Sequence, residues 1–360
     1  MRVHTNYKVR SLKMKDNHLF TPVNLKGLTL KNRIMMSPMC QYSVIEKDGI
    51  ATDWHHHHYI SRAIGGSGLV MVEMTNIEPD GRITDFCLGL WNETQKTKLQ
   101  AIVDGIHQYG AKAAIQIGHA GRKAEHAETP VGPSAIPFDE TFKTPRALEN
   151  AEVYQMIEKY RYSVRAAVEA GFDAIEIHGA HGYLIHQFHS PRSNQRGDEF
   201  GERLTLFGEK VIAAARAEMP NEMPLIVRIS ATEFVDDGYG IETGIDIART
   251  YYEAGADVID VSAGGEGPIS PHGRPGTHAG YQLPYARKVK EALNIPVIAV
   301  GRLDDPILAN AVIGNNEADM VAIGRGLLRN PYWPLTANEQ LRKIAKEEIV
   351  PTQYQPGFRG

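Results

Sequence analysis

A short polar motif, His178-Gly-Ala-His181-Gly-Tyr183, brings together groups that bind oxygen atoms and transfer protons. The glycines allow the backbone to turn sharply, so that both imidazoles and the phenol can reach one site. Such imidazoles could donate hydrogen bonds to a substrate oxygen while Tyr183 delivers a proton. Two alternatives stay open: a metal-dependent hydrolase that uses His178 and His181, and a hydrogen-bonded loop corner without catalytic function.

Two Gly-Arg pairs near the end of the chain, Gly301-Arg302 and Gly324-Arg325, have the composition of a phosphate site. Glycine permits close approach of the backbone and exposes amide hydrogens, and a guanidinium favours a dianion. Each pair alone would be weak support, because glycine after a strand often only forms a turn. Together, after the last two apolar runs of the chain, they predict phosphate binding.

Four consecutive histidines, His55–His58, are a less specific signal. The segment 52–64 has a helical pattern, and adjacent residues of a helix point in different directions. We therefore expect a structural role for this run, not a shared metal ion.

Eight short apolar, β-branched runs, each typical of a strand buried on both faces, alternate with longer segments of helical period. Parallel strands joined by helices form an open sheet or a closed barrel, and eight units in roughly 300 residues favour a single (β/α)8 TIM barrel of the α/β class. The expected strands are 33–37, 68–74, 112–117, 174–178, 225–229, 258–262, 297–300 and 320–323. Besides 52–64, the expected helices are 95–109, 152–170, 204–218, 243–254, 281–293 and 306–314.

The carboxyl ends of barrel strands carry the catalytic groups, so the residues that follow each apolar run are the candidates. No Asp or Glu is among them, which argues against glycoside hydrolysis, and no run ends in the lysine of a Schiff-base aldolase. The first run ends in Pro38-Met-Cys40, whereas hydrolytic metal barrels usually open with paired histidines. The proline-rich segment 119–148 is too long for an ordinary connection and predicts a lid or rim over the site.

The composition of the 360 residues limits the classes of function. The 39 Lys and Arg against 43 Asp and Glu give a net charge of −4, which disfavours a nucleic-acid partner. Two cysteines, Cys40 and Cys87, provide neither a disulfide framework nor an iron–sulfur cluster. No apolar run is long enough to span a membrane, so we expect a cytoplasmic protein without a membrane partner. We expect a basic arm over 1–18, one barrel domain over 19–348 and a tail over 349–360.

An ordered set of motifs covering most of the chain, from about residue 19 to 333, resembles the Old Yellow Enzyme family of flavin ene-reductases. Cys40, with Tyr42 two residues later, resembles the bacterial, thermophilic-type branch of that family. The motifs are Leu30-Lys-Asn-Arg-Ile, Ser37-Pro-Met-Cys-Gln-Tyr42, Gly81-Arg-Ile-Thr, Gln116-Ile-Gly-His-Ala-Gly-Arg-Lys123, His178-Gly-Ala-His-Gly-Tyr-Leu-Ile-His and Gly324-Arg325.

The resemblance implies one FMN at the barrel mouth, with its phosphate held by Gly301, Gly324 and Arg325. It also implies that Gln116 and Arg228 contact the polar edge of the flavin ring, where Arg228 stabilises the charge that reduction places on the ring.

In the same resemblance, Ser37, Pro38, Met39 and Met74 line the ring. Cys40 lies near the flavin and adjusts its reduction potential without attacking the substrate.

The implied mechanism is ping-pong: NADPH or NADH reduces FMN and leaves, and an α,β-unsaturated carbonyl compound, an enone or enal, then receives the hydride. His178 and His181 bind the carbonyl oxygen, Tyr183 protonates the α-carbon, and Tyr42 helps to orient the substrate. No residue serves as a metal ligand in this mechanism.

Relatives of this branch form dimers or tetramers, so the resemblance implies a homo-oligomer. They place an arginine soon after a Gln-Tyr pair to reach the neighbouring subunit. This chain departs from that pattern, because Gln353-Tyr354 continues as Gln-Pro-Gly-Phe-Arg359.

Overall fold

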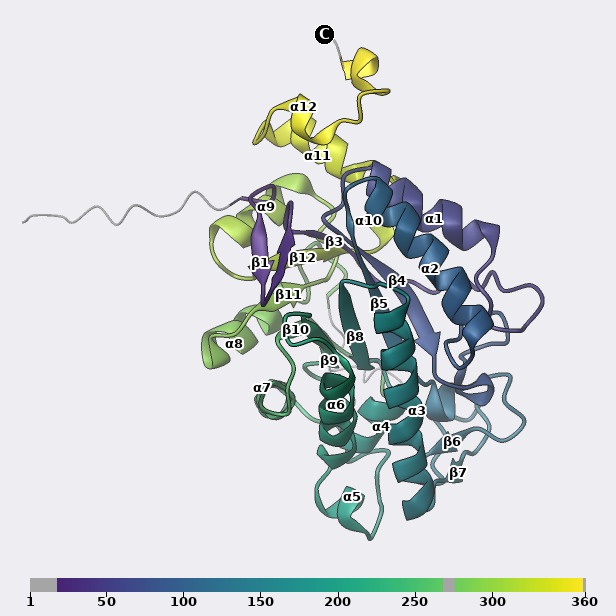
Figure 1. The fold of residues 1–360 in the computed structure, drawn as a ribbon. Coiled ribbons are helices and arrows are strands. Elements are labelled where there is room, and N and C mark those ends of the chain that lie inside the picture. Colours follow the sequence, from purple (N-terminus) through teal and green to yellow (C-terminus); the bar gives the residue numbers. More distant parts are fainter. Residues whose placement is uncertain (1–17, 268–275, 359–360) are drawn as a thin grey trace, which may run out of the picture.

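The eight apolar runs form eight parallel strands that close into a barrel in a computed structural model, which describes residues 18–267 and 276–358 (Figure 1). Each strand pairs with the next along the chain, and the last returns to the first through Val321–Ile34 and Ile323–Met36. The predicted (β/α)8 fold is therefore confirmed. In chain order the barrel strands are β3 (Ile34–Met36), β4 (Leu69–Asn76), β5 (Lys112–Gly118), β8 (Ala174–Gly179), β9 (Leu225–Ser230), β10 (Val258–Ser262), β11 (Val297–Ala299) and β12 (Met320–Ile323).

Alternate residues of each strand face the two sides of the barrel wall. In β3, Ile34 and Met36 belong to the core between strands and helices, whereas Met35 packs inside the barrel with Leu69 and Met71 of β4. Both faces are buried, and this explains why the strands appear in the sequence as continuous apolar runs without polar alternation.

Helices cover the outside of the barrel. Of those given at the end of this paragraph, the first seven lie within a few residues of the predicted segments, and the last two were not predicted. Gly171 and Gly255 have a positive φ, 87° and 123°, at the ends of two of these helices. The helices are α1 (Asp53–Ile64), α2 (Glu93–Gln108), α3 (Asn150–Glu169), α6 (Leu206–Glu218), α7 (Ile241–Glu253), α8 (Leu283–Leu293), α9 (Pro306–Gly314), α10 (Arg325–Arg329) and α11 (Trp333–Leu341).

An antiparallel hairpin of β1 (Val23–Leu25) and β2 (Leu28–Leu30), which was not predicted, closes the amino-terminal mouth of the barrel. Leu25, Leu28 and Leu30 pack with the first interior residues of the strands, among them Ala174 and Val258. The barrel interior is therefore sealed at this end, and a ligand can enter only from the other.

Short elements gather at the carboxyl ends of the strands. In Figure 1, β6, β7 and α4 lie beyond the point of the β4 arrow. Segment 119–148 contains three of these short elements, and its role as a lid or rim over the site stays a prediction. These short elements are the 3-10 helices η1 (Pro79–Gly81) and η2 (Gly121–Lys123), the parallel pair β6 (Val131–Gly132) and β7 (Arg146–Ala147), and the helices α4 (Leu184–His189) and α5 (Glu199–Glu202).

The end of the described chain folds back on its own helices through α12 (Lys346–Ile349) and η3 (Gln355–Phe358). The hydroxyls of Tyr332 and Tyr354 lie 3.2 Å apart, and Lys346 Nζ donates to the carbonyl of Phe358. Arg359 and the expected basic arm, apart from His18, lie outside the described residues. Within the described ranges, no helix is long and apolar enough to cross a membrane.

Candidate active site

The motif after β8 brings its three polar side chains together at the open end of the barrel. His178 is the next-to-last residue of β8, and Tyr183 immediately precedes α4. The ring centroid of His178 lies 5.2 Å from that of His181 and 5.0 Å from that of Tyr183. The structure thus assembles the predicted histidine pair and phenol into one cluster.

A tight turn aims His181 at this cluster. His181 has a φ of 60°, which is uncommon for a residue other than glycine, and its backbone N–H donates to Ser230 Oγ at 3.0 Å. The next residue, Gly182, also has a positive φ, and a Cβ there would lie 2.1 Å from the carbonyl oxygen of Gly265. Only glycine therefore fits this close approach of two backbones.

Both imidazoles of the pair are held in the neutral form. Burial, followed by the nearby Arg228 charge, lowers the pKa of His178 and of His181 well below its usual value. His178 Nδ1 accepts the N–H of Ala180 at 3.3 Å, so that Nε2 carries the hydrogen. His178 therefore presents a neutral N–H donor at the site.

The second imidazole is oriented by a hydroxyl. His181 Nε2 lies 2.7 Å from Ser262 Oγ, and Gln282 Nε2 donates to the same oxygen at 3.4 Å. The Ser262 hydrogen is then free to be donated to His181 Nε2, which leaves Nδ1–H of His181 as its second donor. Ser262 and Gln282 were not predicted to have this role.

Tyr183 lies in an apolar environment next to a cation. Its side chain packs against the cluster that contains Met74 and Cys87, and burial raises its pKa well above its usual value. Lys123 Nζ lies 4.9 Å from the centroid of the Tyr183 ring and donates to the carbonyls of His181 and Gly265. The phenol therefore stays protonated at neutral pH and is available as a proton donor.

The position of Lys123 in the active site was not predicted, although Lys123 is the last residue of one of the family motifs. Burial lowers its pKa to about 8. A useful signal would have been its position, since a lysine close after β5 must lie near the open end of the barrel.

Tyr42, predicted to orient the substrate, lies at the exposed rim of the site. Its side chain is 47% exposed, and its backbone φ is 50°. Electrostatic coupling links Tyr42 to Cys40 and Tyr183, which places it beside the cluster.

Charged and amide groups form the floor of the site inside the barrel. Arg228 Nη2 donates to Ser37 Oγ at 3.3 Å, and its Nε lies 3.3 Å from a carboxylate oxygen of Asp260. Gln116 Nε2 donates to Glu176 at 2.7 Å. The two predicted cofactor ligands, Gln116 and Arg228, are thus fixed by buried partners.

Those buried partners, Glu176 and Asp260, were missed because only residues at the ends of the runs were considered. Burial raises the pKa of both carboxyl groups. A single acidic residue inside an otherwise apolar strand is the sequence signal for such a group, because an unpaired charge there is costly.

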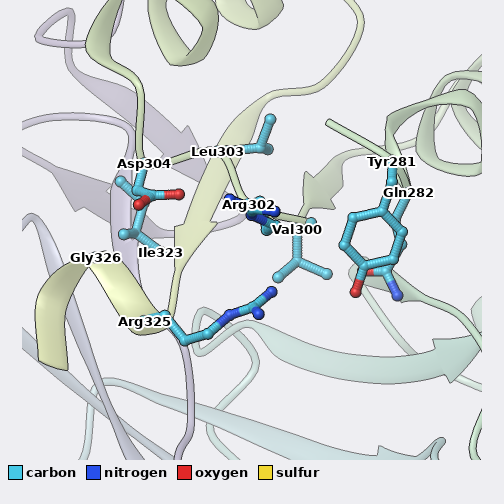
Figure 2. A pocket seen from close by; sticks show the side chains of 11 residues that line it. Tyr281, Gln282, Val300, Arg302, Leu303, Asp304, Ile323, Arg325 and Gly326 are labelled. Carbon is cyan, nitrogen blue, oxygen red and sulfur yellow. The ribbon is translucent and has the colours of Figure 1, made fainter. Parts of the chain in front are cut away.

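The predicted phosphate residues line one pocket at the ends of β11 and β12. Gly301, Gly324 and Arg325 face it together, with Gln282 across from Arg325 (Figure 2). Gly301 has a φ of 122°, and a Cβ on it would lie 2.9 Å from Gln282 Cβ. The pocket therefore depends on a glycine, and it offers a guanidinium and backbone N–H groups to an anion.

The segment after β3 connects this pocket to the histidine cluster. A Cβ on Gly324 would lie 3.4 Å from Met39 Sδ, and Ser37 contacts Arg228. Pro38 lies between Ser37 and Met39 in the sequence. Cys40 follows Met39 and packs against the cluster that contains Met74. These residues fit the FMN that the resemblance implies, with a phosphate cradle at one end, thioethers along the path and donors on the floor.

The metal alternative is not supported. In residues 18–267 and 276–358, no group of three or more His, Cys, Asp and Glu side chains could hold a metal ion. His55 and His58 are buried in α1 whereas His56 and His57 are exposed, as expected for adjacent helical residues. The hydrolase that would use His178 and His181 therefore lacks its metal site.

Comparison with known sequences finds the same family over most of the chain. The model of the NADH:flavin oxidoreductase / NADH oxidase family matches residues 18–343. An NADPH dehydrogenase from Listeria monocytogenes serotype 4a is 44% identical over 345 residues, covering 95% of this chain and 99% of the relative. An NADPH dehydrogenase from Bacillus licheniformis is 45% identical over 332 residues, covering 91% and 96%.

Solved structures share the fold. Morphinone reductase matches with a TM-score of 0.77 and 25% identity, covering 91% of each chain. A 2-naphthoyl-CoA reductase complex matches with a TM-score of 0.84 and 23% identity, covering 92% of this chain and 53% of that chain. This chain therefore spans about half the length of that reductase, and the likeness concerns the fold alone.

Proposed function

Because this chain is an FMN-dependent oxidoreductase of the NADH:flavin oxidoreductase / NADH oxidase family, the Old Yellow Enzyme family, we propose that it reduces the activated C=C bond of α,β-unsaturated carbonyl compounds. The reductant is NADPH or NADH, and the two substrates use one site in a ping-pong sequence. The observation that carries the proposal is the pair of neutral imidazole donors in contact with a protonated, half-buried phenol.

The cofactor's place follows from the two groups of anchoring residues. Gly301, Gly324 and Arg325 would hold the phosphate, and Gln116 and Arg228 would contact the polar edge of the ring. When bound, FMN supplies redox chemistry by accepting a hydride from the nicotinamide and giving one to the β-carbon of the enone.

The histidine pair binds the carbonyl oxygen of the substrate. As the C=C bond of the substrate is reduced, negative charge develops on the carbonyl oxygen. The N–H donors, which Ala180 and Ser262 already orient, stabilise this charge without reorganising. Neutral donors suit both half-reactions, because they do not have to exchange a proton with solvent.

Tyr183, next to His178, gives its proton to the α-carbon. Its high pKa keeps the hydroxyl protonated until charge develops on the substrate. Tyr42, at the rim, would orient the rest of the substrate.

We further propose that the protein assembles as a homo-oligomer, although Figure 1 shows the C-terminal helices packed on their own chain.

An anaerobic visible spectrum of the holoenzyme tests the proposal directly. We expect the flavin absorbance to bleach after NADPH or NADH is added and to return after a simple cyclic enone is added. If the flavin bleached but the enone did not restore its absorbance, the protein would be an oxidoreductase without ene-reductase activity.

Replacing Tyr183 by Phe separates the proton donor from the rest of the site. We expect the rate of enone reduction to fall at least about a hundredfold, the lower end of the usual contribution of general acid catalysis, while flavin reduction by NADPH changes little. Stopped-flow absorbance measures both half-reactions.

The matched control is Tyr160→Phe in α3, since Tyr160 is a fully buried tyrosine away from the site and its hydroxyl has no hydrogen-bond partner in the described parts of the chain. This control should leave both rates unchanged. Equal losses of both half-reactions in Tyr183→Phe would exclude the proton-donor role.

A further inference from the structure

The two cysteines of the chain meet at the edge of the active site. Cys40 follows β3 and is partly exposed, whereas Cys87 is fully buried after η1. Both pack in one cluster with Met74 and Ile83, and the interaction between the two thiols raises the pKa of Cys40 and lowers that of Cys87. Two cysteines that are distant in sequence thus have their sulfur atoms side by side.

Backbone hydrogen bonds hold the two cysteine segments together. The N–H of Val44 donates to the carbonyl of Phe86 at 3.1 Å, and the N–H of Gly89 donates to the carbonyl of Gly49 at 2.9 Å. Residues just after Cys40 are therefore connected to the residues on both sides of Cys87. This pairing brings the backbone segments of the two cysteines together.

We propose that Cys40 and Cys87 form a reversible disulfide at the mouth of the active site, with a hydroperoxide as the oxidant. This inference goes beyond the proposed function, because the bond can form and be detected whether or not the protein reduces an enone. The family resemblance assigns Cys40 a role in tuning the flavin and gives no role to Cys87.

The environment of the pair favours this chemistry. Hydrogen bonds from the Cys40 thiol and from the backbone and side chain of Thr84 lower the pKa of Cys87 to about 7, while the same contact raises the pKa of Cys40. Cys87 can therefore ionise near neutral pH and accept the proton of Cys40, whose thiolate is the form that reacts with an oxidant.

The reaction balances with hydrogen peroxide alone. Cys40 is the sulfur that a small molecule can reach, so its proton moves to Cys87 and the Cys40 thiolate attacks one peroxide oxygen. The O–O bond breaks and gives a sulfenic acid on Cys40 and a hydroxide, which takes the proton of Cys87. The Cys87 thiolate then attacks the Cys40 sulfur, the S–O bond breaks, and the departing hydroxide is protonated by solvent. Two thiols are oxidised, and one peroxide is reduced to two waters.

The bond would alter the site as well as the chain. It replaces the Cys40 thiol beside the flavin position and fixes a sulfur close to Tyr42 and Tyr183, whose pKa values both respond to these two cysteines. It also closes a loop of the 46 residues that separate the cysteines, including all of α1 and β4. We expect the visible spectrum of the bound flavin to shift when the bond forms.

Intact mass spectrometry and thiol counting of the holoenzyme test the proposal. After a few equivalents of hydrogen peroxide, we expect the denatured wild-type chain to lose both titratable thiols and about 2 Da, the mass of two hydrogens, and to recover both with dithiothreitol. Peptide mapping should find the Cys40 and Cys87 peptides joined. Retention of both thiols would overturn the proposal, and so would their conversion to products heavier by about 16 Da per oxygen without a lighter species.

Single variants supply the controls. Cys87→Ser and Cys87→Ala leave Cys40 without a partner, so peroxide should convert it to oxygenated products or leave it unchanged, with no loss of mass. If one of these variants fails to fold, the other variant and the wild-type peptide map still decide the question. Because none of these readouts uses an enone, failure of the disulfide and failure of the ene-reductase are distinguishable.

Discussion

Glu73 is a buried carboxyl group on β4 whose protonation should influence the pH dependence of stability. Its oxygens accept hydrogen bonds from the backbone N–H of Gln41 at 3.0 Å and from the hydroxyl of Tyr59 at 2.6 Å. Burial raises its pKa to about 8 in spite of these bonds. The folded protein therefore binds a proton that the unfolded chain, with a carboxyl pKa of about 4.3, has released at neutral pH.

The sign of the effect follows from that difference. The protonated carboxyl contributes its full stability below about pH 4.3, and the contribution is lost progressively as pH rises toward about 8. Glu73→Gln cannot ionise, so between pH 5 and 8 the wild type should lose more free energy of unfolding than the variant, by on the order of a few kcal/mol. Thermal melts at both pH values measure this difference.

Glu78→Gln is a suitable control, because the pKa of Glu78 is shifted in the opposite direction to that of Glu73. Burial disfavours the Glu78 carboxylate, but hydrogen bonds and ion pairs with His119 and Lys159 outweigh burial and lower its pKa to about 2. Its contribution is lost only as pH falls from about 4.3 toward 2, so Glu78→Gln should leave the slope between pH 5 and 8 unchanged. Parallel slopes for wild type and Glu73→Gln would show that Glu73 is ionised in the folded protein.

Residues could be predicted from the sequence where their chemistry lies at a strand end. His178, His181 and Tyr183 form one motif after a strand, so their proximity follows from local geometry. Glu73 and Lys123 could not be assigned in this way, because their environments come from loops and strands distant in sequence. A pKa depends on such long-range partners, and a residue pattern contains little information about them.

Gly301 lies two residues beyond the end of β11, where the predicted phosphate pocket depends on the shape of the backbone. Gly301→Ala would place a Cβ 2.9 Å from Gln282 Cβ, at a φ of 122° that side chains avoid. We expect the variant to fold but to bind FMN at least about tenfold more weakly, which corresponds to about 1.4 kcal/mol. Titration of the apoprotein with FMN, followed by fluorescence quenching, measures the affinity.

Gly110→Ala separates backbone strain from damage to the pocket. Gly110 also has a positive φ, 71°, but a Cβ there would meet no atom within 4 Å. Both substitutions should lower the melting temperature of the apoprotein, since each places alanine at a positive φ. If Gly110→Ala weakened FMN binding as much as Gly301→Ala, the loss would reflect general destabilisation and Gly301 would have no specific role.

The elements differ in how well the sequence predicts them. The eight barrel strands were predicted because both of their faces are buried, which gives continuous apolar runs. The hairpin β1–β2 was missed because its strands have only three residues each. α4 was missed for another reason: all six of its residues are buried, so that it has no amphipathic period.

At the scale of the whole molecule, the barrel closes through its own strands, whereas the cofactor site joins parts that are far apart in the chain. Ser37 after β3, Arg228 on β9 and the glycines after β11 and β12 would all contact one FMN. The hairpin and the hydrophobic core that close the barrel do not include these residues. We therefore expect the apoprotein to keep its secondary structure and to lose only the stability that binding adds.

That expectation can be measured by removing FMN and restoring it. A ligand that binds only the folded state adds about 2.7 kcal/mol at a free concentration one hundred times its dissociation constant. The melting temperature of the apoprotein should therefore rise as FMN is added, and the Gly301→Ala variant should need proportionally more FMN for the same rise. Circular dichroism of the apoprotein should match that of the holoenzyme. A melting temperature that did not respond to FMN would show that these residues do not form its site, while loss of the dichroism signal would show that the barrel needs the cofactor to close.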